Sequence, residues 1–215
     1  MRHLVDPRIE ALFAFIKNPK CELNFSNFYE LTVAVLLSAQ TTDKKVNTVT
    51  SVLFKKYPNW ASLRESKIED LALILKPLGL SLRKSKLLKA LALKLLDYQD
   101  KLPKEKEELL SLPGIGEKTC AVILTEGFSV PAIAVDTHVK RVSNRLGLSI
   151  NEDPTKIMKD LEKLVPKEFY HRLHLTLVHF GRYFCLASKP KCDICILKKE
   201  CSYYQNLDLN HKDKK

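Results

Sequence analysis

Residues 111–120, SLPGIGEKTC, are the stretch that decides how this chain folds. A short predicted helix, KEKEELLS, leads into it, and a second predicted helix, EKTCAVILTEGF, leads out of it. Gly114 and Gly116 permit positive φ, so the stretch predicts a helix, a tight hairpin and a second helix. The first N–H groups of the second helix have no partner within that helix. Such a hairpin can bind phosphate, and glycines without a Cβ let a DNA backbone approach closely.

Lys118 lies just inside the second predicted helix. One interpretation is a solvated surface lysine, which is the commoner state of lysines in proteins. The other is an amine that serves as a nucleophile. Asp136, which follows the apolar residues 132–135, also has two interpretations. It caps a helix, or it faces Lys118 across a cleft, where it accepts a proton or stabilises developing positive charge.

The overall charge favours a polyanionic partner. The chain has 36 basic and 25 acidic residues among 215, a formal net charge of +11. Nucleic acid is the first partner class that this predicts and an anionic membrane the second, while a merely soluble basic protein also fits. Arg141 and Arg145 are four residues apart on one predicted helical face, which either contacts phosphate or is a solvated basic face.

The chain shows no targeting or membrane segment. Its first residues, MRHLVDPRIEALF, are interrupted by charges and Pro7, unlike a signal peptide. No apolar run is long enough to span a bilayer. We therefore expect no membrane association, a cytoplasmic location with the chromosomal DNA, and reduced thiols.

Four of the six cysteines have the spacing C-x6-C-x2-C-x5-C. Four soft thiolates in 17 residues indicate a structural metal site, and the spacing alone leaves zinc and a four-iron cluster equal. The predicted ligands are Cys185, Cys192, Cys195 and Cys201. Lys189 and Lys191 lie in the loop between the first two, which would hold both charges rigidly for phosphate contact. Cys21 and Cys120 are interpreted as small buried hydrophobic residues.

Most other segments have helical periodicity, and alternating strand patterns are scarce. We therefore predict an all-α fold. Helix starts are indicated by Asp-Pro pairs and by capping boxes. These are Asp6–Pro7, Asp153–Pro154, Asn27 with Glu30, and Ser66 with Glu69.

Taken together, the chain resembles the endonuclease III group of the helix-hairpin-helix DNA glycosylases. The resemblance rests on LTVAVLLSAQTTD, LPGIGEKT, VDTHVKRVSNR and the four cysteines, in this order. It implies two all-α lobes on either side of a DNA-binding cleft. A six-helix barrel with the hairpin would comprise residues 21–131. A second lobe would join residues 1–20 to 132–204 and hold a [4Fe-4S] cluster, with a polar tail at 205–215.

The resemblance also implies roles for single residues. Lys118 would attack C1′ of a damaged nucleotide, displace the base, form a Schiff base and cut the strand by β-elimination, with Asp136 as its carboxylate partner. Gln40 would fill the space left by the flipped base, although it also fits a helix C-cap. Leu80 would be an apolar wedge. Glu117 departs from the family, because many members are basic there.

A related subfamily removes adenine from mismatches with a glutamate and lacks the hairpin lysine. Lys118 is present here and Val35 stands at the position aligned with that glutamate. The resemblance therefore implies a monomeric, bifunctional DNA glycosylase/AP lyase of base excision repair. Its substrates would be oxidised pyrimidines and abasic sites in double-stranded DNA. The alternatives are a non-catalytic helix-hairpin-helix DNA-binding protein with a structural metal site, and a secondary redox-sensing role for the cluster.

Overall fold

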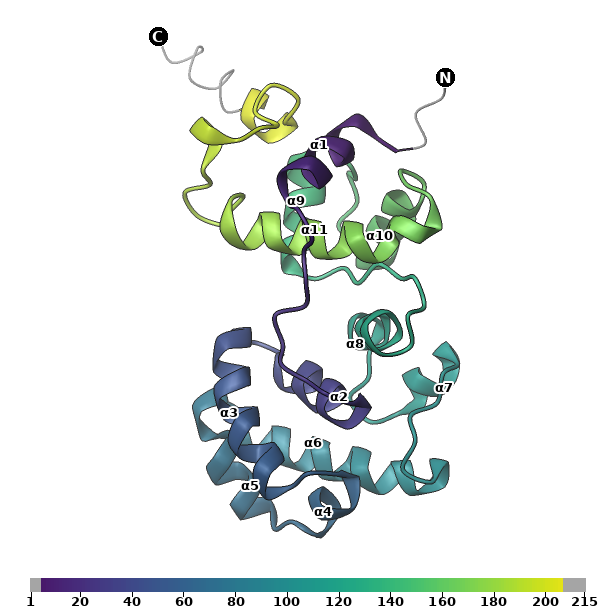
Figure 1. Ribbon diagram of the computed structural model, residues 1–215. Coiled ribbons are helices and arrows are strands. Elements are labelled where there is room, and N and C mark those ends of the chain that lie inside the picture. Colours follow the sequence, from purple (N-terminus) through teal and green to yellow (C-terminus); the bar gives the residue numbers. More distant parts are fainter. Residues whose placement is uncertain (1–4, 207–215) are drawn as a thin grey trace. The chain divides into compact units, whose positions relative to one another are not determined.

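The structure is a computed structural model that describes residues 5–206 (Figure 1). Within that range the regular structure is entirely helical, which confirms the all-α prediction. Residues 1–4 and 207–215, which include most of the predicted polar tail, lie outside the described range. Contacts within the chain define two compact units, one of residues 1–20 with 131–215 and one of residues 21–130. The unit of residues 21–130 ends one residue before residue 131, where the sequence placed the end of this lobe.

The unit of residues 21–130 is built around α2, Phe28–Leu37. Eight of the ten residues of α2 are buried, which explains why its sequence is apolar on all sides. The elements that follow are α3 (Asp43–Lys56), α4 (Trp60–Glu65), α5 (Ile68–Leu75), η1 (Lys76–Leu78), α6 (Ser81–Lys94), η2 (Leu95–Tyr98), α7 (Lys106–Ser111), α8 (Glu117–Val122) and the π-helical turn η3 (Ile123–Gly127).

The other unit joins the first helix of the chain to its C-terminal part. Its elements are α1 (Pro7–Phe15), α9 (Thr137–Arg145), α10 (Pro154–Glu162), η4 (Lys167–Phe169), α11 (Tyr170–Tyr183) and η5 (Cys192–Ile194). Figure 1 draws α1 (purple) beside α11 (green), and the two pack together. Their shared core includes Ile9, Leu12, Leu173, Leu177 and Phe180. Residues far apart in the sequence therefore make one hydrophobic core.

Most of the predicted helix starts are confirmed. The side chains of Asp6, Asn27 and Asp153 each accept a backbone N–H of the first helical turn. The capping box of Ser66 and Glu69 is wrong. The N-cap of α5 is Lys67 and has no side-chain hydrogen bond, because the Ser66 hydroxyl instead donates to the carbonyl of Leu63 at the end of α4.

In the part of the chain that the structure describes, none of the helices combines the length and hydrophobicity of a membrane span. Residues 202–206 are helical and follow the last cysteine directly, so the predicted polar tail starts inside ordered structure. Gln205 donates its backbone N–H to the carbonyl of Cys201 at 3.0 Å.

Candidate functional site

Residues 112–116 form the predicted hairpin between α7 and α8. Gly114 has φ +79°, and a Cβ there would lie 2.7 Å from the side chain of Leu87. Gly116 has φ −95°, so only Gly114 uses the positive φ that both glycines permit. A Cβ on Gly116 would nevertheless meet nothing within 4 Å. The backbone at the start of α8 is therefore open to a ligand on that side.

Lys118 is exposed and is the second residue of α8. Within residues 21–130, all of which the structure describes, its ammonium has no hydrogen bond or ion pair. The neighbouring Glu117 is paired, because its carboxylate lies 2.9 Å from the Nζ of Lys106. This contact raises the pKa of Lys106. The Lys118 amine is thus available while the acidic residue beside it is neutralised by another lysine.

Asp136 is the N-cap of α9, in the other unit. Its Oδ1 accepts the backbone N–H groups of His138 at 2.9 Å and Val139 at 2.8 Å. No protein donor within its own unit, as far as residues 5–20 and 131–206 describe it, reaches Oδ2. The structure therefore confirms Asp136 as a helix cap, and its second carboxylate oxygen is left without a protein donor in the described part of this unit.

His138 and Arg141 lie on the same helix as Asp136. The Nη2 of Arg141 lies 3.1 Å from the Nδ1 of His138, which must accept because a guanidinium only donates. Burial lowers the pKa of His138, and the charge of Asp136 opposes this effect. Arg141 also donates to the carbonyls of Gly181 at 2.7 Å and Cys185 at 3.0 Å. The solvated face predicted for Arg141 is therefore wrong.

Arg145, one turn further along α9, is also held within its unit. It donates to the carbonyls of Leu186 at 2.6 Å and Ala187 at 3.0 Å. Its guanidinium lies 4.4 Å from the ring centre of Tyr203. The structure thus shows both arginines fastening the segment around the first predicted cysteine ligand to α9, a role that the sequence spacing did not reveal.

The four clustered cysteines are all free thiols in one unit. Burial raises the pKa of Cys195, and the charges of the other three clustered cysteines add to this effect. Among residues 5–206 no three such side chains are close enough to hold one metal ion. Four clustered cysteine thiols are a donor set that suits either an iron–sulfur cluster or a structural zinc ion.

Gln40 and Leu80 each occupy a left-handed backbone conformation, with φ of 60° and 50°. Both are exposed, and the side chain of Leu80 is 55% accessible. Gln40 lies two residues beyond the C-cap of α2, which is Ser38, so its interpretation as a C-cap is wrong. Non-glycine residues in this conformation are uncommon. The backbone therefore displays one amide and one large apolar side chain at strained turns.

Lys189 and Lys191 lie in the loop between the first two clustered cysteines. Both are exposed, and Lys189 has φ 52°. The Lys191 ammonium lies 5.5 Å from the ring centre of Phe184, and its backbone N–H donates to the Phe184 carbonyl. The loop is folded back on the end of α11 with its charges outward.

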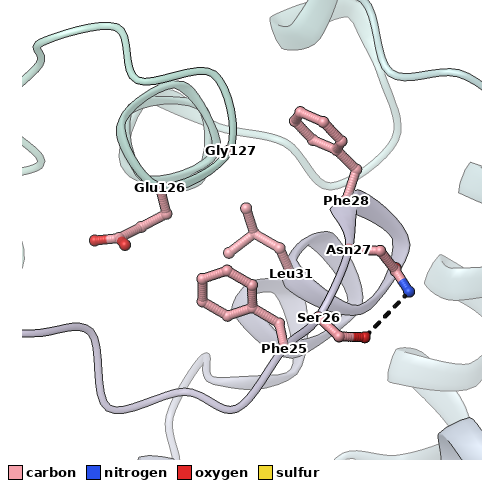
Figure 2. A pocket seen from close by; sticks show the side chains of 7 residues that line it. All are labelled: Phe25, Ser26, Asn27, Phe28, Leu31, Glu126 and Gly127. Carbon is pink, nitrogen blue, oxygen red and sulfur yellow. Dashed lines mark hydrogen bonds between the residues drawn. The ribbon is translucent and has the colours of Figure 1, made fainter.

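A pocket that the sequence did not indicate lies between the start of α2 and the turn η3 (Figure 2). Figure 2 shows Leu31 between the rings of Phe25 and Phe28, with Glu126 and Gly127 on the facing turn. None of the predicted site residues lines it. In the sequence, the apolar residues of this pocket look like ordinary core residues. The π-helical turn that completes the pocket has no simple periodicity, so the sequence gives no signal for it.

Comparisons with known proteins give one consistent result. The HhH-GPD superfamily of base excision DNA repair proteins matches residues 33–167. Endonuclease III of Bacillus subtilis (strain 168) is 44% identical over 191 residues, which cover 88% of this chain and 87% of that protein. A solved non-covalent endonuclease III–DNA complex superposes with a TM-score of 0.91 at 37% identity, covering 94% of this chain and 95% of the other. A trapped covalent endonuclease III–DNA intermediate superposes with a TM-score of 0.90 at 38% sequence identity, covering 93% of this chain and 95% of the other.

Proposed function

This chain belongs to the endonuclease III family, within the HhH-GPD superfamily of base excision DNA repair proteins, and we propose that Lys118 and Asp136 carry out its reaction. The protein is a DNA glycosylase with AP lyase activity, and its partner is DNA. We assign each step of the reaction to residues of this chain and infer that the lesions it removes are oxidised pyrimidines.

The neutral Lys118 amine attacks C1′ of the damaged nucleotide, and the bond from C1′ to the base breaks with its electron pair leaving on the base. The bond between C1′ and O4′ then breaks with its electron pair leaving on O4′, and O4′ takes one proton from Nζ. The sugar ring is thereby opened and a protonated Schiff base joins Nζ to C1′. Loss of a proton from C2′ then allows the bond between C3′ and the phosphate oxygen to break, which cuts the strand. The observation that carries this assignment is the exposed, unpaired amine placed directly after the open glycine hairpin.

Asp136 assists this chemistry with its free oxygen. It accepts a proton or stabilises the positive charge that develops on the sugar and on the amine. The bonds to His138 and Val139 hold the carboxylate in one orientation, so little reorganisation is needed during the reaction.

The proposed DNA contacts are the open hairpin at Gly114 and Gly116 and the outward lysines, Lys189 and Lys191. Gln40 fills the space of the extruded nucleotide and Leu80 enters the base stack, which offsets part of the unstacking cost of a few kcal/mol. Arg141 and Arg145 act indirectly, because their donors already fasten the cysteine segment.

Cys185, Cys192, Cys195 and Cys201 would hold a [4Fe-4S] cluster, with zinc as the lesser alternative. The group would be structural, because four protein ligands close its coordination. The donor set supports this assignment, as do the hydrogen bonds that the Arg141 and Arg145 guanidinium groups donate to the backbone carbonyls of residues 185–187. The location is the cytoplasm, with the chromosomal DNA.

The lesions are oxidised pyrimidines, and a panel of duplexes that each carry one lesion tests this. Wild-type protein should release oxidised pyrimidines and cut the strand, while Lys118→Gln loses both by at least about 10³-fold. Lys104→Gln removes an exposed lysine before α7 and should keep nearly full activity. Base release at an undiminished rate by Lys118→Gln would move the nucleophile to another residue.

A further inference from the structure

Lys84 is a buried lysine in the first half of α6, with only 6% of its surface accessible. Burying an ammonium is costly unless its donors are satisfied. Its three donors match three backbone carbonyls, those of Leu37 at 3.1 Å, Ala39 at 3.2 Å and Leu78 at 3.1 Å. In residues 21–130, no carboxylate forms an ion pair with it.

The three carbonyls come from two different segments of the chain. Leu37 is the last residue of α2, and Ala39 follows it in the turn beyond. Leu78 is the last residue of η1. The ends of helices carry unsatisfied carbonyls and partial negative charge, which suits a cation. One ammonium thus joins the end of α2 to the end of η1.

Two of the three joined carbonyls lie within two residues of a left-handed, non-glycine residue. Gln40 follows Ala39, and Leu80 follows Leu78 after Gly79. A left-handed conformation is strained for a non-glycine residue, because Cβ lies too close to the following carbonyl oxygen. Strain of this kind persists where the surroundings enforce it and is concentrated at functional sites. The Lys84 ammonium supplies such enforcement, since it fixes both segments from the inside while both side chains remain exposed.

We propose that Lys84 is a positioning residue that holds Gln40 and Leu80 at a fixed separation, so that they enter a DNA duplex together. This inference rests on the roles proposed above for these two side chains. The two side chains are held in position before DNA binds. The entropy cost of ordering two loops during base extrusion is therefore avoided. Lys84 itself touches no substrate.

The test compares Lys84→Met with Lys89→Met. Lys89 lies on the same helix and donates to the carbonyl of Ser66, at the junction of α4 and α5, so its variant also loses a bond from a lysine to a backbone carbonyl, partly buried and away from both loops. Single-turnover rates are measured on a duplex with one base-paired lesion and on a single-stranded oligonucleotide with an abasic site, where no base is extruded. Lys84→Met should lose about 10- to 100-fold on the duplex and at most about twofold on the single strand. Lys89→Met should stay near wild type on both.

A second comparison, made in a protein that lacks both positioned side chains, separates positioning from general destabilisation. In a Gln40→Ala, Leu80→Gly protein, Lys84→Met should cause no further loss on the duplex, because the residues through which it acts are absent. Equal losses on both substrates, or an undiminished loss in this background, would overturn the proposal. If Lys84→Met does not fold, Lys84→Arg, which keeps charge and donors but alters their reach, is judged by the same ratio of the two rates.

The result also separates this inference from the proposed function. A wild-type protein that does not cut the single-stranded abasic site through Lys118 contradicts the proposed chemistry. A wild-type protein that cuts it, with a Lys84→Met rate ratio equal to that of wild type, contradicts the positioning role alone.

Discussion

The ammonium of Lys106 lies 2.9 Å from a carboxylate oxygen of Glu117, which places a salt bridge between the two helices of the hairpin. Both groups are partly exposed, so the pair adds little to stability. Its effect is on the local charge. The acidic residue next to Lys118 is neutralised by a lysine that would otherwise face solvent.

Glu117→Gln should strengthen binding to undamaged duplex DNA. The substitution frees the charge of Lys106, and the slope of log affinity against log salt should steepen by about one if that charge reaches a phosphate. Lys106→Gln should do the opposite. A salt titration of binding measures both slopes, and identical slopes for the three proteins would show that the hairpin makes no such phosphate contact.

Asp136→Asn and Asp136→Ala should separate capping from chemistry. Asparagine keeps a cap oxygen, so Asp136→Asn should unfold close to wild type, whereas Asp136→Ala should lose about 1 kcal/mol of unfolding free energy. Both should lose about 10²-fold or more in base release, since neither retains the carboxylate. Denaturant unfolding and single-turnover kinetics on the same preparations provide the comparison. An active Asp136→Asn would leave Asp136 as a cap alone.

Leu80→Gly should change stability and activity in opposite directions. Glycine adopts the left-handed conformation without strain, so the unfolding free energy should stay level or rise by up to about 1 kcal/mol. Activity on duplex lesions should fall, because the apolar side chain is gone. A variant that is both more stable and fully active on duplex would show that the strain at Leu80 has no function.

Cys195→Ser should lower the iron and sulfide bound per chain, while Cys21→Ser should leave both unchanged. Cys195 is one of the four clustered thiols, whereas Cys21 packs against the core of the other unit. Elemental analysis of freshly purified protein gives the answer, and zinc in place of iron in the wild-type protein would favour the alternative metal.

Asp6→Asn should weaken the fold near neutral pH and not in acid. Arg8 lowers the pKa of Asp6 by donating to its carboxylate, at 2.7 Å, and the backbone N–H of Arg8 adds to this. A carboxyl whose pKa is lowered by folding stabilises the protein above its unfolded value near 3.9 and loses that contribution as pH falls through the folded value. Asparagine keeps a cap oxygen but loses the ion pair with Arg8, so unfolding at pH 7 should show a deficit of up to about 1 kcal/mol. The deficit should shrink as the pH falls through the acid range. A deficit that does not change with pH would assign the effect to packing.

The sequence predicted well where a local signal determined the structure. The Asp-Pro pairs marked helix starts because proline is preorganised for the first turn and aspartate accepts its N–H groups. The capping box predicted at Ser66 was wrong because a serine hydroxyl can bond to the end of the preceding helix as readily as it caps the next helix. The first residue of α11 follows Phe169, which gives no side-chain cap, so that helix start carried no comparable signal.

The sites were less predictable where contacts between residues far apart in the sequence determine what a side chain does. Arg141 and Arg145 have the spacing of a phosphate-binding face, yet their partners lie about 40 residues away in sequence, at residues 181–187. In the sequence, Lys84 is one of many lysines on an amphipathic helix. Only the fold shows that it is buried against three backbone carbonyls. No local pattern encodes either contact.

Reductive trapping tests the assignment of the nucleophile most directly. The protein is mixed with a duplex that carries one oxidised pyrimidine, borohydride is added during the reaction, and the modified lysine is identified by peptide mapping. We predict one adduct per chain, on Lys118, and its disappearance in Lys118→Ala. An adduct of equal yield in that variant, or one mapped to another lysine, would contradict the account.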